Sequence, residues 1–305
     1  MTIAELLESV RRVEVRTNRL VNDTMVGAYL SHFKGRGMDF EELREYIPGD
    51  EVRDIDWNVT YRMGRPFVKR FREERELGLI LAIDISASSA FGSLRRSKRE
   101  FATEIAGTLA ISAARSSDKV ALLLFTDQVE LFLPPRKGRR HILRLIREML
   151  FFEPKHQGTD IPATLAFLNH ILHRRSIIFL LTDFLHSFGP AAPRRGAGRD
   201  IVQEIGLTNA RHDLICLHLH DPREEELPPA GLLTVEDSET GELLEVDSGR
   251  PAVRTRYAQV NAERLAELER ALRRAGVDTL RFSTAEPFAQ GLQWFFETRR
   301  GRRRG

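Results

Sequence analysis

Short apolar runs alternate with longer stretches of helical periodicity from residue 79 onward. The apolar runs carry almost no charge, which is typical of strands buried on both faces of a parallel sheet. They lie at 79–83, 120–125, 129–133, 176–181, 214–219 and 277–282. The stretches between and after them predict helices at 97–116, 138–150, 161–172, 199–209, 256–275 and 286–297. Because strands and helices alternate, we predict an α/β fold: a doubly wound, mostly parallel sheet flanked by helices.

The sequence before and within this pattern predicts two additions. Residues 3–32 have helical periodicity, and the densely charged segment that follows contains an alternating stretch, 67–71, typical of a strand. Residues 231–247 predict a β-hairpin with Gly241 in its turn. The Pro- and Gly-rich stretch 186–199 predicts a surface loop. The predicted divisions of the chain are an N-terminal segment at 1–76, an α/β domain at 77–298 and an Arg-rich tail at 299–305.

Composition supports a large folded domain with a basic tail. The 305 residues are 42% hydrophobic, enough for one large α/β domain and an appendage. The net charge is +3, but five arginines from Arg299 to Arg304 contribute five positive charges, which leaves −2 on the residues before them. Such a tail can bind nucleic acid or anionic lipid, or can simply be solvated. We favour the solvated tail and expect no specific nucleic-acid partner.

The cysteine content and the lack of targeting segments in the sequence indicate the cellular compartment. Its single cysteine, Cys216, lies in an apolar run, so an internal disulfide is impossible and a buried, inert thiol is expected. No long uncharged apolar segment predicts a transmembrane helix, and the charged N-terminus does not resemble a secretory signal. We therefore expect a cytoplasmic protein.

Polar side chains that could bind a ligand lie at the ends of two predicted strands and just before a predicted helix. Asp84, Ser86 and Ser88 follow the first buried strand, Thr159 precedes a helix, and Asp183 ends a later strand. The carboxyl ends of parallel strands meet at one edge of a sheet, where open α/β folds bind ligands. Two carboxylates and three hydroxyls there would offer the hard oxygen ligands that Mg²⁺ or Mn²⁺ prefers. The alternative is that these side chains only cap helices.

This set resembles the metal-ion-dependent adhesion site of the von Willebrand factor A (vWA) fold, whose pattern is D-x-S-x-S followed by a distant Thr and a distant Asp. The resemblance implies that Ser86 and Ser88 coordinate the metal, that Thr159 does so directly or through water, and that Asp84 and Asp183 act largely through waters. It also implies an open coordination position that takes an acidic side chain of a partner protein. Phe184 stands where many relatives have Gly, which could alter the loop.

The upstream sequence resembles the signature of the domain-of-unknown-function 58 family. The matching stretches are 44–57 (REYIPGDEVRDIDW), Arg62, 74–75 and, after the Cys216 strand, 221–224 (DPRE). Members of that family have a vWA-like core and are typically encoded near MoxR-type AAA+ ATPases. The resemblance implies that the chain acts with such an ATPase in chaperone-like assembly or activation of other proteins.

Alternatives remain for the charged N-terminal segment and for the activity. Arg44, Asp50, Asp56 and their neighbours could form a network that docks this segment against the core, with Trp57 buried, or they could form a partner-binding surface. We favour the docking network. A phosphatase using Asp84 as nucleophile would need a second Asp where Ser86 stands, and no P-loop or G-x-S-x-G motif is present. We therefore expect no enzymatic activity.

Overall fold

The computed structural model describes most of the chain. The residues described are all those outside 1–10, 12, 18–19, 21–37, 74–77, 95, 186–199, 239–240 and 302–305. The predicted loop at 186–199 and most of the predicted helix at 3–32 lie outside this description, although residues 13–17 are helical.

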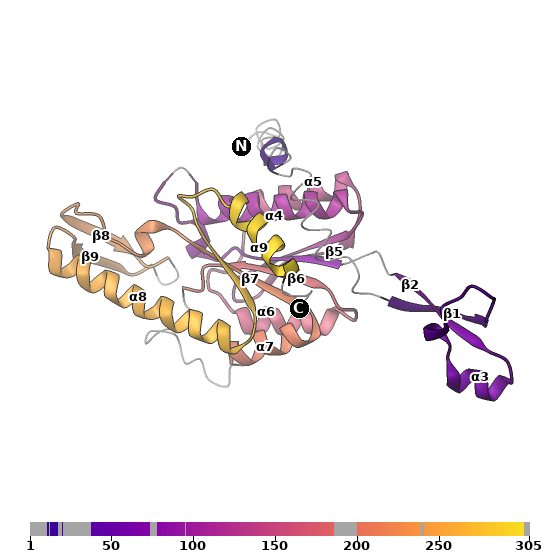
Figure 1. The fold of residues 1–305 in the computed structure, drawn as a ribbon. Coiled ribbons are helices and arrows are strands. Elements are labelled where there is room, and N and C mark those ends of the chain that lie inside the picture. Colours follow the sequence, from indigo (N-terminus) through magenta and orange to yellow (C-terminus); the bar gives the residue numbers. More distant parts are fainter. Residues whose placement is uncertain are drawn as a thin grey trace.

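A six-stranded sheet forms the centre of the described structure (Figure 1). In spatial order its strands are β10 (Asp278–Ser283), β7 (Asp213–His220), β6 (Ile177–Thr182), β3 (Gly78–Asp84), β4 (Lys119–Phe125) and β5 (Val129–Arg136). All neighbouring pairs are parallel except β4 and β5, which form an antiparallel edge. The prediction of a doubly wound, mostly parallel sheet is therefore confirmed. Because β3 lies between β6 and β4, the carboxyl ends of β3 and β6 are direct neighbours.

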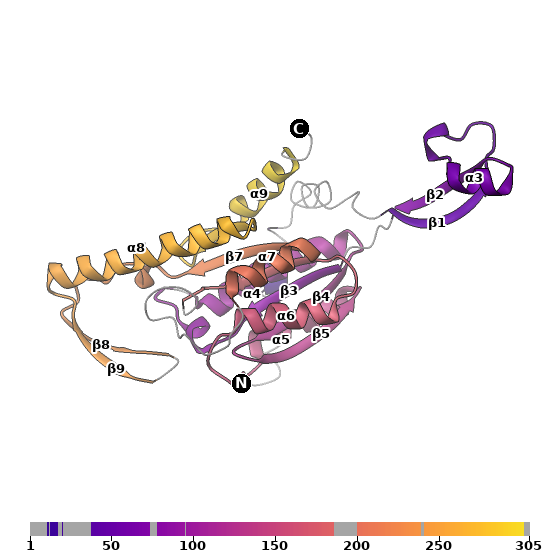
Figure 2. The same ribbon diagram turned by 90° about the horizontal axis from the view of Figure 1, so that it is seen from below.

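Helices cover both faces of this sheet (Figures 1 and 2). Leu79, Leu81 and Ile83 pack into one core cluster with α4, α5 and α9, and Ile80 and Ala82 face the other cluster with α6, α7 and α8. This alternation along β3 explains why its sequence is apolar at every position. The helices are α4 (Lys98–Arg115), α5 (Arg139–Phe151), α6 (Ile161–Ile171), α7 (Ile201–Arg211), α8 (Pro251–Arg274) and α9 (Ala289–Gly301).

An N-terminal appendage projects from this body (Figure 1). It consists of β1 (Met38–Glu45), the 3₁₀ turn η1 (Val52–Asp54), α3 (Trp57–Met63) and β2 (Phe67–Glu73), with β1 and β2 paired antiparallel. The alternation at 67–71 predicted β2, whereas β1 was not predicted. We use the name appendage for residues 38–73 below.

The prediction that charged residues of the N-terminal segment dock it against the core, with Trp57 buried, is wrong. Arg44 forms a bidentate ion pair with Asp50, at 2.8 and 2.7 Å, but both residues belong to the appendage. Asp56 pairs with Lys69 of the same unit at 2.8 Å. The Trp57 side chain, predicted to be buried, is 65% exposed. These ion pairs therefore link parts of the appendage to one another, and Trp57 does not supply the buried area that docking would need.

The hairpin and the last helix follow β7 in the sequence. The predicted hairpin is confirmed as β8 (Leu232–Glu236) and β9 (Leu243–Asp247), and Gly241 has the positive φ of 73° that its turn requires. Helix α9 extends to Gly301, so Arg299, the first residue of the predicted tail, lies in a helix and pairs with Asp213 at 2.6 Å. No helix among the described residues is long and apolar enough to span a membrane.

Candidate functional site

The turn after β3 presents the first three predicted site residues. Asp84 ends the strand, and its Oδ1 accepts a hydrogen bond of 2.9 Å from the backbone N–H of Ser86. In the same turn the hydroxyls of Ser86 and Ser88 share a hydrogen bond, with their Oγ atoms 3.1 Å apart. The Ser89 hydroxyl instead donates to the backbone oxygen of Ser86 at 2.7 Å and stabilises the turn from within.

The end of β6 brings Asp183 to the same place. The Ser88 hydroxyl donates to Asp183 Oδ2 at 2.7 Å, and the hydroxyl of Thr182 donates to Asp84 Oδ2 at 2.6 Å. These bonds cross between two neighbouring strands, because parallel strands place their carboxyl ends together. Four of the five predicted residues therefore form one connected, buried cluster: Asp84, Ser86, Ser88 and Asp183.

Thr159, the fifth predicted residue, lies on the loop before α6. The backbone oxygen of Gln157 accepts a 3.0 Å bond from the N–H of Ala87, which ties the loop to the turn after β3. Glu130 Oε1 holds the loop from the other side by accepting bonds from the N–H groups of Lys155 and His156, at 3.1 and 3.0 Å. The Thr159 Oγ1 atom is buried and has no hydrogen-bond partner among the described residues. A buried hydroxyl without a partner is costly, so this oxygen is available to a ligand that the loop would hold.

One further polar side chain in the cluster was not predicted. Lys98, the first residue of α4, places its Nζ 2.6 Å from Asp183 Oδ2 and also pairs with Glu224. Glu224 belongs to the 3₁₀ turn η3 (Pro222–Glu224) after β7, and its other oxygen accepts from the N–H of Asp221 at 2.9 Å. The DPRE motif marked Glu224 as part of a signature, but a lysine at the start of a helix gives no sequence signal of burial.

The charges in the cluster shift the ionisation of its members. Burial, together with the nearby negative charge of Asp183, raises the pKa of Asp84 to about 6. Burial opposes ionisation of Asp183 as well, but the charge and hydrogen bond of Lys98 outweigh it and lower the pKa of that carboxyl. Burial alone would lower the pKa of Lys98, and its two carboxylate partners reverse this effect and raise it. At neutral pH the lysine and Asp183 therefore form a buried ion pair.

The backbone after Asp183 shows how the chain accommodates Phe184 where the vWA pattern often has Gly. Phe184 has a φ of 53°, in the left-handed region that bulky side chains rarely adopt. Its ring is buried and packs edge-on against the ring of His218, with centroids 6.0 Å apart. The loop thus keeps a glycine-like backbone, and the aromatic contact stabilises it.

The donor set fits a small hard cation. In an octahedral Mg²⁺ site with bonds of roughly 2.1 Å, neighbouring ligands lie about 3 Å apart. The separation between the Ser86 and Ser88 oxygens matches this spacing. Among the described residues no group of three or more His, Cys, Asp and Glu side chains could hold a metal ion. A metal here would therefore rest on the hydroxyls, with the carboxylates supplying negative charge.

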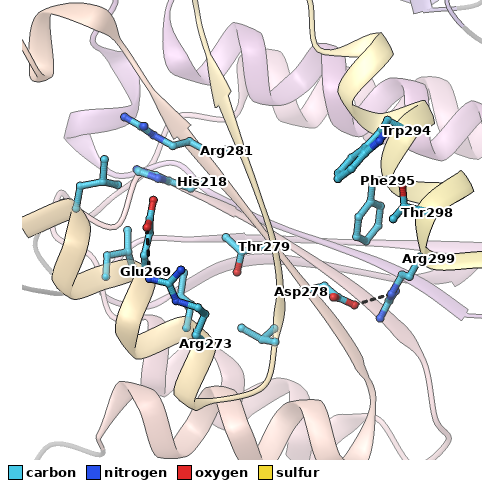
Figure 3. Close-up of a pocket in the computed structure, with 14 residues that line it drawn as sticks. His218, Glu269, Arg273, Asp278, Thr279, Arg281, Trp294, Phe295, Thr298 and Arg299 are labelled. Atoms are coloured by element: carbon cyan, nitrogen blue, oxygen red, sulfur yellow. Dashed lines mark ion pairs between the residues drawn. The ribbon is translucent and has the colours of Figure 1, made fainter. Parts of the chain in front are cut away.

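A separate hollow of about 430 Å³ lies between α8, β10 and α9 (Figure 3). Leu268 and Leu272 of α8 and Trp294 and Phe295 of α9 give it apolar walls. The ion pair between Arg299 and Asp278, at 2.5 Å, closes one end. This hollow brings together none of the five predicted site residues.

The comparisons with known proteins assign the chain to a family. The model of the family described as "Protein of unknown function DUF58" matches residues 42–267. The chain belongs to this family, as its signature motifs predicted.

Among its relatives are the uncharacterized proteins Mb1516 of Mycobacterium bovis and Rv1480 of Mycobacterium tuberculosis. Each is 28% identical over 298 residues, which cover 97% of this chain and 90% of the relative.

Solved structures with related architecture are more distant. An aerotolerance-related membrane protein of Bacteroides fragilis has a TM-score of 0.47 at 15% identity, over 74% of this chain and 99% of that chain. The conserved hypothetical protein BatB of Bacteroides thetaiotaomicron has a TM-score of 0.45 at 15% identity, over 73% and 98%. The vWA domain of SpRpn10 has a TM-score of 0.38 at 10% identity, over 71% and 93%.

Proposed function

We propose that this chain is a non-enzymatic, protein-binding module that uses a divalent metal, Mg²⁺ or Mn²⁺, at the carboxyl edge of its sheet. The observation that carries the proposal is the pair of Ser86 and Ser88 oxygens, 3.1 Å apart, beside two buried carboxylates. The unpartnered hydroxyl of Thr159, on a loop tied to the same turn, supports it. These side chains would hold the metal, which would supply positive charge for an acidic side chain of a partner.

The surroundings of the site favour a protein partner. Beyond β7, the hairpin of β8 and β9 exposes Leu232, Leu243 and Leu244. The hairpin follows η3, which contributes Glu224 to the site, and exposed apolar residues of this kind are typical of interaction surfaces. On the basis of the family resemblance, we propose that the partner system includes a MoxR-type AAA+ ATPase and serves chaperone-like assembly or activation of other proteins.

Metal binding by purified protein tests the first half of the proposal. Titration with Mn²⁺, followed by electron paramagnetic resonance, should reveal one site in the wild type and none in Ser86→Ala. Ser89→Ala is the matched control, because its hydroxyl lies in the same turn but bonds the backbone. Equal Mn²⁺ binding by Ser86→Ala and the wild type would place any metal elsewhere and overturn the proposal.

Partner capture tests the second half. The tagged wild type should retain an AAA+ ATPase from its native cell in Mg²⁺ and lose it in EDTA, whereas Ser86→Ala should fail under both conditions. Circular dichroism should show that the variant is folded. Retention of the ATPase by Ser86→Ala in EDTA would show that this site is not the interface.

A further inference from the structure

Lys98 occupies a position that is unfavourable for a cation in two respects. Its side chain is 2% exposed, and lysine is almost never fully buried unless it is paired. It is also the first residue of α4, where the helix dipole disfavours positive charge. Asp183 and Glu224, from two different strand ends, compensate for both effects. Lys98 therefore acts as a cation that the chain itself supplies to the cluster.

This cation shares an oxygen with the candidate metal ligands. Asp183 Oδ2 accepts from Lys98 Nζ at 2.6 Å and from the Ser88 hydroxyl at 2.7 Å. A divalent ion that takes the Ser88 oxygen must lie within a few ångströms of the same carboxylate. Two cations there would repel each other, because burial leaves little water to screen them.

We propose that Lys98 competes with the divalent metal for Asp183, so that the metal-free site is held closed by the ammonium and metal affinity is set below what the ligands alone would give. This inference rests on the proposed function. It names how the site is regulated: the metal competes with Lys98 for the negative charge of Asp183, and Glu224 holds the lysine when its pair with Asp183 weakens.

The formal charges give this arrangement a consequence for the partner. Asp84, Asp183 and Glu224 with Lys98 sum to −2, which one divalent ion cancels. Without Lys98 the loaded site would keep one negative charge and would repel a partner carboxylate. The lysine therefore weakens metal binding and at the same time favours an acidic ligand on the loaded metal.

The decisive experiment compares Mn²⁺ affinity in variants with matched charge. The double variant Lys98→Met/Glu224→Gln removes the lysine and one carboxylate, so its formal site charge equals that of the wild type. Because competition at Asp183 is gone, it should bind Mn²⁺ about tenfold more tightly. Affinity equal to or weaker than that of the wild type would overturn the inference, and would leave the proposed function standing if Ser86→Ala has lost the site.

A milder variant covers the case in which the double variant does not fold. Glu224→Gln keeps Lys98 and leaves its whole charge on Asp183, so Mn²⁺ affinity should fall several-fold. Glu225→Gln is the control, because Glu225 is adjacent but pairs with Arg281 and His220 and not with Lys98. Equal or tighter binding by Glu224→Gln would overturn the inference. Failure of every protein, wild type included, to bind Mn²⁺ would overturn both proposals.

Discussion

The site at the carboxyl edge of the sheet and the N-terminal appendage contain the same kinds of residue but differ in how far these residues are buried. Both combine Asp carboxylates with cationic side chains, and both carry family-signature residues. At the site, Asp84, Asp183 and Lys98 are buried and bonded to one another. In the appendage the ion pairs are local, and Trp57 and Tyr61 are 65% and 90% exposed. The difference shows that the core encloses the charged side chains of the site, whereas those of the appendage pair with one another nearer to solvent.

The largest expected effect comes from breaking the buried ion pair. Asp183→Ala should lower the free energy of unfolding by about 3–5 kcal/mol, because it leaves the Lys98 charge buried with one partner fewer. Urea denaturation measures the change. Asp50→Ala in the appendage is the comparison, since its partner Arg44 is closer to solvent. A loss of stability as large for Asp50→Ala as for Asp183→Ala would erase the contrast between the two regions.

His218, whose ring packs against Phe184 next to the site, should make the stability of the protein depend on pH. Burial, with smaller repulsion from His220 and Arg281, lowers the pKa of His218 from 6.5 to about 3. Between these values the unfolded chain binds more protons, so this contribution is full above pH 6.5 and is lost as the pH falls toward 3. The slope is up to about 1.4 kcal/mol per pH unit.

Urea denaturation from pH 7 to pH 4 in the wild type and in His218→Leu isolates this term. The stability of the variant should fall less steeply with acidification than that of the wild type. Parallel curves for the two proteins would show that His218 takes up its proton over the same pH range in the folded and the unfolded chain.

Arg299 should have an intermediate effect, because it anchors α9 to the sheet. Arg299→Ala removes charged hydrogen bonds to Asp213 and Asp278 and should cost about 2–3 kcal/mol. Thermal unfolding measures the loss. Deletion of residues 302–305 is the control and should leave the stability unchanged while reducing retention on heparin. A deletion that destabilises the protein as much as Arg299→Ala would show that the tail has a structural role.

The smallest effect is expected in the appendage. Trp57→Ser and Tyr61→Ser should change the free energy of unfolding by no more than about 0.5 kcal/mol, since these side chains are exposed. Phe179→Ala, in the core, should by contrast cost about 3–5 kcal/mol. If Trp57→Ser destabilises the isolated protein like a core substitution, the appendage is covered in solution, for instance by another copy of the chain.

Much of the fold could be predicted because the physical signal is local. Uncharged runs such as 79–83 specify strands buried on both faces, and the order of strands and helices specifies a parallel sheet. The same rule placed Asp84 and Asp183 at one edge. The strand β1 was missed because its alternation is short: Met38 and Phe40 alternate with acidic residues, but a register shift between Phe40 and Glu42 breaks the pattern before Leu43.

The sequence by itself determined the sheet, its two apolar faces and the meeting of the D-x-S-x-S turn with the end of β6. The tertiary structure alone decided that Lys98 is buried and Trp57 is not. Burial depends on which segments cover a side chain, and Lys98 is enclosed by Asp183 and Glu224, which lie 85 and 126 residues away along the chain. No pattern around Lys98 encodes those partners, because they are brought to it by the order of the strands.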